Sequence, residues 1–243
     1  MTATKNTDSK PAWGTKPPPS RGPKPSLTAS EIARAAIQLA DEEGLQAVTM
    51  QRVAQTVGVT TMALYRYFPG KSDLLALMID SASDAPLNLG RPASSWKTRL
   101  KKWVRQCLAI YRNHPWFLEA TSVRNSPMGP NELAWMEAAL AMLAESGLKP
   151  KDQHRAFLAL LWLVRGHTRF QQIGADHESA YSWKHDLAQL LKSEPDRYPA
   201  LVHALNSGQF FGDPDGAFDF GLDCILEGIS ARVSQHNARL RQR

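Results

Sequence analysis

The chain has 243 residues, of which 43% are hydrophobic and 21% charged, and its formal net charge at pH 7 is +6. This composition fits a globular chain of one large domain or two small ones. Its two cysteines exclude a disulfide-built fold, and its longest apolar run, residues 156–164, is shorter than the roughly 20 residues of a membrane-spanning helix. The first residues lack an apolar signal segment, so we expect a cytoplasmic protein.

Residues 1–26 contain six prolines and five basic residues against one acidic residue. Such a segment buries too little apolar surface to offset the entropy lost on ordering. We therefore predict a disordered basic arm. Its role is that of a solubilising tail or, alternatively, of an arm that contacts DNA beside a DNA-binding domain.

Short helices are predicted directly after this arm. Thr28 and Glu31 have the spacing of a capping box, and Gly44 ends the helix that they begin. Gly58 and the Pro69-Gly70 pair interrupt the following apolar periodicity. The expected helices cover residues 28–43, 49–57, 60–67 and 72–80.

The rest of the chain is also predicted to be helical. An apolar stripe at helical spacing begins with Trp96, after a cap at Ser94 or Ser95. No sustained alternation indicates a strand, so we predict an all-α fold with a small N-terminal unit and a larger C-terminal bundle. The expected helices cover residues 95–111, 115–118, 132–146, 152–173, 181–192, 195–207 and 216–239.

Residues 49–71, TMQRVAQTVGVTTMALYRYFPGK, have the pattern of a helix–turn–helix. Val57 and neighbouring apolar residues can pack against Leu64 across the turn at Gly58. The second helix then presents a hydroxyl, an apolar group and a guanidinium to a DNA groove, from Thr61, Met62, Tyr65 and Arg66. Tyr67 and Lys71 follow, where they could bind phosphate. The alternative for Tyr65 and Tyr67 is that one ring packs in the core.

Charge alone does not indicate DNA binding by this segment. Residues 27–80 hold four basic and six acidic side chains, and we interpret Asp41, Glu42 and Glu43 as a solvated helix end. Hydroxyls, backbone N–H groups and helix N-termini bind phosphate without any net positive charge.

The pattern V-T-M-Q-R-V-A-x-x-V-G-V-x-x-x-A-L-Y-R-Y-F-x-x-K, followed by x-D-L-L, resembles the TetR family of bacterial transcriptional repressors. The later part of the chain resembles the tetracycline-repressor subfamily at Trp96, Pro130–Leu143 and Ala217–Ile229. The resemblance implies a helix–turn–helix domain over residues 27–73 and a ligand-binding and dimerisation domain over residues 74–243. It also implies a homodimer that binds a palindromic operator and is released by a small molecule.

The same resemblance assigns contacts with DNA. The expected base-edge contacts are Gln51, Thr61, Met62 and Arg66. The expected backbone contacts are Thr49, Thr60, Tyr65, Tyr67 and Lys71. Arg52 fits either role, and Ala63 completes the DNA-binding set at a position that varies in the family.

Large aromatic side chains in the C-terminal part form a helical core or line a ligand pocket. The pocket candidates are Trp103, Tyr111, Trp116, Trp135 and Trp162, with Arg165, His167 and Gln171 as polar anchors. The alternative for the three anchors is a solvated or partner-facing helix face. Tetracycline-binding members place polar groups where this chain has Trp103 and about Leu87, so we expect a hydrophobic or aromatic effector instead.

The resemblance places the dimer interface on the 152–173 and 216–239 helices. The stripe that we expect on the last helix is Phe218, Leu222, Ile225, Leu226, Ile229 and Val233. Its alternative is a core within one chain. Cys107 and Cys224 are both expected to be small core side chains.

The alternatives are a helical enzyme and a DNA-binding regulator without a small-molecule ligand. A helical enzyme would need a nucleophile–base pair, a phosphate loop or a metal motif, and the sequence shows none of these. The seven histidines lack metal-ligand spacing, so we expect no metal and no cofactor. A DNA-binding regulator without a small-molecule ligand would share the helix–turn–helix and lack only the pocket.

Overall fold

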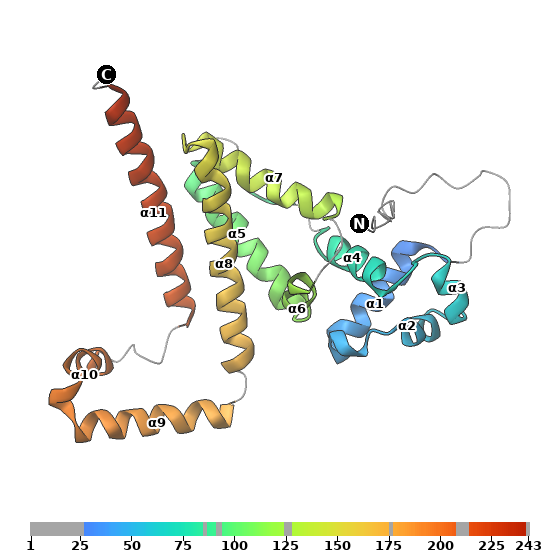
Figure 1. The fold of residues 1–243 in the computed structure, drawn as a ribbon, viewed down its shortest axis with the longest axis horizontal. Helices are drawn as coiled ribbons and strands as arrows, with labels where there is room; N and C mark the ends of the chain where they lie inside the picture. Colours follow the sequence, from blue (N-terminus) through green and yellow to red (C-terminus); the bar gives the residue numbers. More distant parts are fainter. Residues whose placement is uncertain are drawn as a thin grey trace, which may run out of the picture. The chain divides into compact units, whose positions relative to one another are not determined.

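The structure is a computed structural model, which describes residues 27–84, 87–90, 94–123, 128–174, 177–207 and 214–241 (Figure 1). Within these ranges all regular secondary structure is helical, which confirms the predicted all-α class. The predicted arm, residues 1–26, lies outside them. None of the helices in the described ranges is long and apolar enough to cross a membrane.

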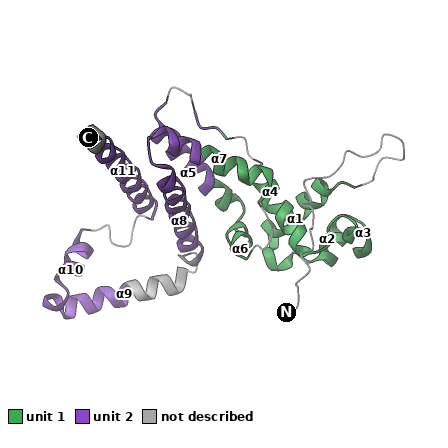
Figure 2. Cartoon of the chain, turned by 45° about the horizontal axis from the view of Figure 1, so that its top comes forward, with its two compact units in different colours: residues 1–87, 109–138 green, residues 88–108, 139–243 purple. Residues whose placement is uncertain are grey.

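The chain forms two compact units, residues 1–87 with 109–138 and residues 88–108 with 139–243 (Figure 2). Helices α5 (Trp96–Asn113) and α7 (Pro130–Glu145) contribute to both units. The first unit thus contains more of the chain than the expected helix–turn–helix domain. That the domain boundary falls after residue 73 stays a prediction.

The first unit begins with the four predicted helices. It also contains one short 3-10 turn that the sequence did not predict. These elements are α1 (Ala29–Glu43), η2 (Leu45–Ala47), α2 (Met50–Thr56), α3 (Thr61–Tyr65) and α4 (Lys71–Ala82). The capping box at Thr28 is present, with the Glu31 amide donating to the Thr28 Oγ1 at 3.2 Å. Gly58 has φ +71°, a conformation that glycine adopts without steric cost, and it allows the sharp turn between α2 and α3.

The core of this first region comes from inward-facing side chains of each helix. Ile32, Val53, Leu64 and Phe68 are fully buried, as is Leu74 of α4. Helices this short have little stability alone, so the shared core holds them in place.

The later helices follow the predicted order with shifted ends, except that the one helix expected over residues 195–207 is a 3-10 turn followed by a short α-helix. They are α6 (Phe117–Ser122), α8 (Pro150–Gly174), α9 (His177–Ser193), η3 (Pro195–Arg197), α10 (Pro199–Asn206) and α11 (Pro214–Arg241). Ser95 is the residue that caps α5, since its Oγ accepts from the Thr98 amide at 3.2 Å.

Helices α8 and α11 pack against each other in the second unit. Phe218, Leu222, Leu226 and Ile229 are buried within the single chain, so these four residues of the stripe expected at the dimer interface belong to the intrachain core, whereas Ile225 and Val233 are half-buried. The correction has a simple cause: a period of 3.6 residues shows that a face is apolar but not which surface covers it.

The two cysteines differ. Cys107 is buried as predicted, and burial raises the pKa of its thiol well above the usual value. Cys224 is exposed on α11, so its assignment to the core was wrong.

Candidate functional site

Helix α3 packs against the core on its inner face and is exposed on its outer face. Leu64 is fully buried, whereas Met62 is 76% exposed and Arg66, just after the helix, is exposed as well. The Thr60 hydroxyl accepts from the Ala63 amide at 3.2 Å and so fixes the start of the helix. This arrangement presents a short, rigid helix whose outward side chains can enter a groove.

The two tyrosines after Leu64 face outward, and neither ring is a core side chain. Tyr65 is 45% and Tyr67 37% exposed, and the Tyr67 hydroxyl donates to the Leu27 carbonyl at 3.0 Å. The ring that fills the core is Phe68, which the sequence argument did not single out. The sequence feature that could have indicated its burial is its position four residues after Leu64, which places both side chains on the same face of a helical turn.

The other expected DNA contacts lie at the beginnings of α2 and α4. Thr49 caps α2, with its hydroxyl accepting from the Arg52 amide at 3.2 Å, and Gln51 is exposed beside it. Lys71 is the first residue of α4 and is exposed. The residues in the predicted DNA-binding set therefore belong to α2, α3, their caps and the first turn of α4, except Tyr67, which lies in the turn between α3 and α4. Their roles stay predictions.

The acidic end of α1 has specific partners, so its interpretation as a merely solvated end was incomplete. Asp41 accepts from the Trp116 indole Nε1 at 2.6 Å and lies 2.9 Å from His114 Nδ1. Gln46 adds a 2.8 Å hydrogen bond to Glu119. The Asp41 contacts fasten α1 to the segment that leads into α6, and the Gln46 bond joins η2 to α6 itself. They join residues more than 70 positions apart, so no local pattern reveals them.

A buried carboxylate joins α4 to α7. Asp80 accepts from the backbone amides of Asn131 at 2.8 Å and Glu132 at 3.2 Å, at the start of α7. Gly129 lies so close to Asp80 that a Cβ there would collide with its carboxyl group. One turn further along α7, the Trp135 indole donates to the Ser83 carbonyl at 2.8 Å.

Asp80→Asn is expected to weaken the pH dependence of folding. Burial raises the pKa of Asp80 above its usual value, more than hydrogen bonds from Glu132 and Asn131 lower it. The folded state thus binds the proton more tightly than the unfolded state, and this contribution to stability fades as pH rises through the Asp80 pKa. Denaturant unfolding at several pH values should show the wild type losing stability relative to Asp80→Asn as pH rises. The exposed Asp186→Asn should not show this trend.

Four of the five aromatic pocket candidates are buried, and they are divided between the two units. Trp103 packs on Phe157 in the second unit, with ring centroids 5.9 Å apart. In the first unit Tyr111 meets Phe117 edge-on at 5.1 Å, and the Trp116 and Trp135 indoles donate hydrogen bonds to Asp41 and Ser83. Trp162 is different, because its side chain on α8 is 65% exposed.

The polar anchor candidates all lie on α8, and two of them contact the first turn of α11. His167 Nε2 is 3.3 Å from an Asp215 carboxylate oxygen, and the imidazole ring lies 4.7 Å from the Phe218 ring. Gln171 donates to Asp215 at 3.4 Å, and Arg165 is half-buried. Two of the three anchors thus contact this turn of their own chain, and a ligand role stays a prediction.

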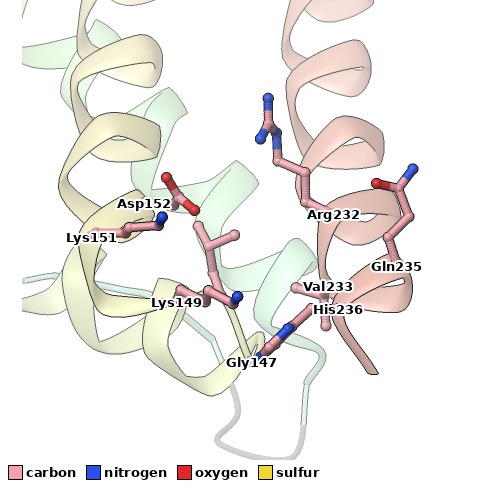
Figure 3. A pocket seen from close by; sticks show the side chains of 9 residues that line it. Gly147, Lys149, Lys151, Asp152, Arg232, Val233, Gln235 and His236 are labelled. Carbon is pink, nitrogen blue, oxygen red and sulfur yellow. The ribbon is translucent and has the colours of Figure 1, made fainter. Parts of the chain in front are cut away.

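One hollow of about 170 Å³ lies between the turn that precedes α8 and the end of α11 (Figure 3). Its basic side chains are Lys149, Lys151, Arg232 and His236. The expected ligand residues do not line this hollow, and its basic lining does not suit a hydrophobic effector. It is therefore a different feature from the expected pocket.

Comparison with known proteins identifies the family. Residues 89–233 match the family described as "Tetracyclin repressor-like, C-terminal domain", and residues 32–78 match "Bacterial regulatory proteins, tetR family". The chain belongs to the TetR family. This TetR-family protein is a transcriptional regulator, as the sequence resemblance predicted.

Individual relatives support the same conclusion. The TetR-family chain is 37% identical to the HTH-type transcriptional repressor DrrR1 of Streptomyces coeruleorubidus, over 92% of this chain and 84% of that protein. It is 26% identical to the class A tetracycline repressor protein of Escherichia coli, over 85% of this chain and 92% of that protein. The structure of Streptomyces coelicolor ActR in complex with actinorhodin has 27% identity and a TM-score of 0.75, covering 86% of this chain and 97% of ActR.

Proposed function

We propose that this protein is a repressor that binds a palindromic operator as a homodimer and is released by a small molecule. The observation that carries the proposal is the outward face of α3, anchored by Leu64 and capped by Thr60. Bacterial DNA lies in the cytoplasm, so a repressor acts there. In this proposal residues 27–73 form the DNA-binding domain, and residues 74–243 form the ligand-binding and dimerisation domain.

The DNA contacts follow from side-chain chemistry. Arg66 suits a guanine, Gln51 an adenine and Met62 a thymine methyl group, and Thr61 can contact any of several base edges. The remaining members hold phosphate or fix the helix against the DNA backbone. They are Thr49, Arg52, Thr60, Ala63, Tyr65, Tyr67 and Lys71.

DNA binding is tested first with duplexes selected by the full-length protein from randomised DNA. A two-fold footprint on the selected duplex, resistant to competitor DNA, is the expected result. Its half-sites should lie about one helical turn apart, because a symmetric dimer presents two recognition helices. Binding without sequence preference and with strong salt dependence would contradict a specific operator.

Arg66→Ala is expected to cost about 1–3 kcal/mol in operator affinity and to relax the preference at one base pair of each half-site. The guanidinium would otherwise donate two hydrogen bonds to one guanine. Affinities for duplexes substituted at each position measure the effect. Arg34→Ala is the matched control, because Arg34 is an exposed arginine of the same unit, on α1. Equal base preferences in the wild type and Arg66→Ala would refute the assignment.

The homodimer is proposed to form through α8 and α11, on faces other than the buried stripe. Trp162 and Phe170 are 65% and 63% exposed on α8, and Phe220 is 73% exposed on α11. Gly166 and Gly228 have open space where a Cβ would stand, so a second helix can approach closely. A two-fold interface would bury these side chains against the same side chains of a second copy.

The effector is proposed to be a hydrophobic or aromatic small molecule. The lining candidates are Trp103, Tyr111, Trp116, Trp135 and Trp162, with Arg165, His167 and Gln171 as anchors. ActR, which is similar over most of its length, has been crystallised with actinorhodin. An effector raises the unfolding temperature by mass action and shifts the dimer from its DNA-bound state. A screen of aromatic compounds by thermal shift therefore separates this proposal from a regulator without a ligand.

A further inference from the structure

The last residue of α1, Glu43, forms a two-pronged ion pair with Arg52 in the first turn of α2. Arg52 Nη1 donates to Glu43 Oε2 at 2.7 Å, and Arg52 Nη2 donates to Glu43 Oε1 at 2.6 Å. The hydrogen bond from Arg52 lowers the pKa of Glu43, and the bond to Glu43 raises the pKa of Arg52. Both side chains are therefore charged at neutral pH, and one edge of the guanidinium is occupied.

The position of Glu43 is unfavourable for α1 itself. The C-terminal end of a helix carries a partial negative charge, so a carboxylate there is repelled. Arg52 offsets this repulsion. The pair therefore stabilises the end of α1 and at the same time occupies one edge of the Arg52 guanidinium.

Arg52 is one of only four basic residues between residues 27 and 80. It lies beside Gln51 and Thr49, in the proposed DNA-binding set. A phosphate binds a guanidinium through two parallel hydrogen bonds, which is the geometry that Glu43 uses here. One edge of Arg52 cannot bind the carboxylate and a phosphate at the same time.

We propose that Glu43 competes with DNA phosphate for Arg52 and so limits the affinity of the repressor for its operator. The proposal rests on DNA binding through α2 and α3. The pair is exposed, so it can open without exposing a hydrophobic core, and water can solvate either charge. Glu43 thus weakens binding at all sites and leaves base preference to Gln51 and the residues of α3.

The test compares Glu43→Gln with the wild type on a duplex that the wild type selects from randomised DNA. We expect roughly three- to tenfold tighter binding, and a log-affinity against log-salt plot steeper by about one phosphate contact per protomer. The base preference at each position should not change. Arg52→Gln should cancel the gain, so that the double variant binds no more tightly than Arg52→Gln alone.

Glu42→Gln is the matched control, because it removes the same charge from the neighbouring residue. Glu42 accepts a hydrogen bond from Gln38, whereas the two hydrogen bonds of the Arg52 guanidinium go to Glu43. A gain that Glu42→Gln reproduces, or that survives Arg52→Gln, would overturn the proposal and leave only a general charge effect. Weaker binding by Glu43→Gln would also overturn it and would make the carboxylate a support for Arg52. A wild type that selects no duplex would refute the proposed function, and this inference with it.

Discussion

Phe68→Ala is expected to destabilise the first unit by about 3–5 kcal/mol and to abolish operator binding. The ring is fully buried, and the Phe68 amide donates to the Leu64 carbonyl at 3.1 Å. Removing the ring leaves a cavity in a core formed by short helices, which cannot collapse to fill it without moving α3. Because whole domains are stable by only about 5–15 kcal/mol, this loss is a large share of the total.

The measurement is denaturant unfolding followed with circular dichroism, together with operator binding. Tyr67→Ala is the control for stability alone, since Tyr67 is the neighbouring aromatic residue, is partly exposed and belongs to the proposed DNA-binding set. This variant should lose little unfolding free energy beyond the contribution of the hydrogen bond from Tyr67 to Leu27. Phe68→Ala would contradict the packing argument if its unfolding free energy stayed within about 1 kcal/mol of the wild-type value.

The sequence was sufficient for the fold class and the helix–turn–helix, for physical reasons that are local. A capping box, a turn glycine and a proline-glycine break act within a few residues of each other. Thr28, Gly58 and the Pro69-Gly70 break accordingly marked elements that the structure contains. Helix ends shifted by one to four residues, because terminal turns depend on contacts with the rest of the chain.

The features that the sequence did not reveal depend on distant parts of the chain. The bonds of Asp41 to Trp116 and of Asp80 to the start of α7 bring together residues separated by 75 and 51 to 52 positions. Polar side chains such as these give no periodic signal. Whether a polar residue is solvated or paired is decided by the packing of whole helices.

Helix α11 shows a second feature that could not be predicted from the sequence, namely which of its apolar faces is buried within the chain. It has a buried apolar stripe that includes Phe218 and Leu222, and an exposed aromatic side chain at Phe220. The first face was assigned to the dimer because the family resemblance places the interface on this helix, and because so many apolar residues on a terminal helix suit a buried interface. In the structure α8 already covers that face, so the second face, which includes Phe220 and Cys224, is the one open to another chain.

A chain with both Trp162→Glu and Phe220→Glu is therefore expected to be monomeric. In a two-fold interface each substitution occurs twice, so the double variant places four carboxylates in a desolvated patch. Burying unpaired charges costs several kcal/mol, which exceeds what the remaining contacts can offset. Analytical ultracentrifugation should then give the mass of one chain, 27.0 kDa, instead of a dimer.

Operator binding should fall with the dimer, although no DNA-contacting residue has changed. A monomer binds one half-site and loses the gain from linking two binding modules, which is typically 10²- to 10⁴-fold. Leu133→Glu is the matched control, because Leu133 is a half-exposed leucine on α7, outside the proposed interface. That variant should stay dimeric and bind DNA normally. A double variant that remained a dimer would exclude these faces of α8 and α11 as the interface, and a monomer with full operator affinity would show that one recognition helix suffices.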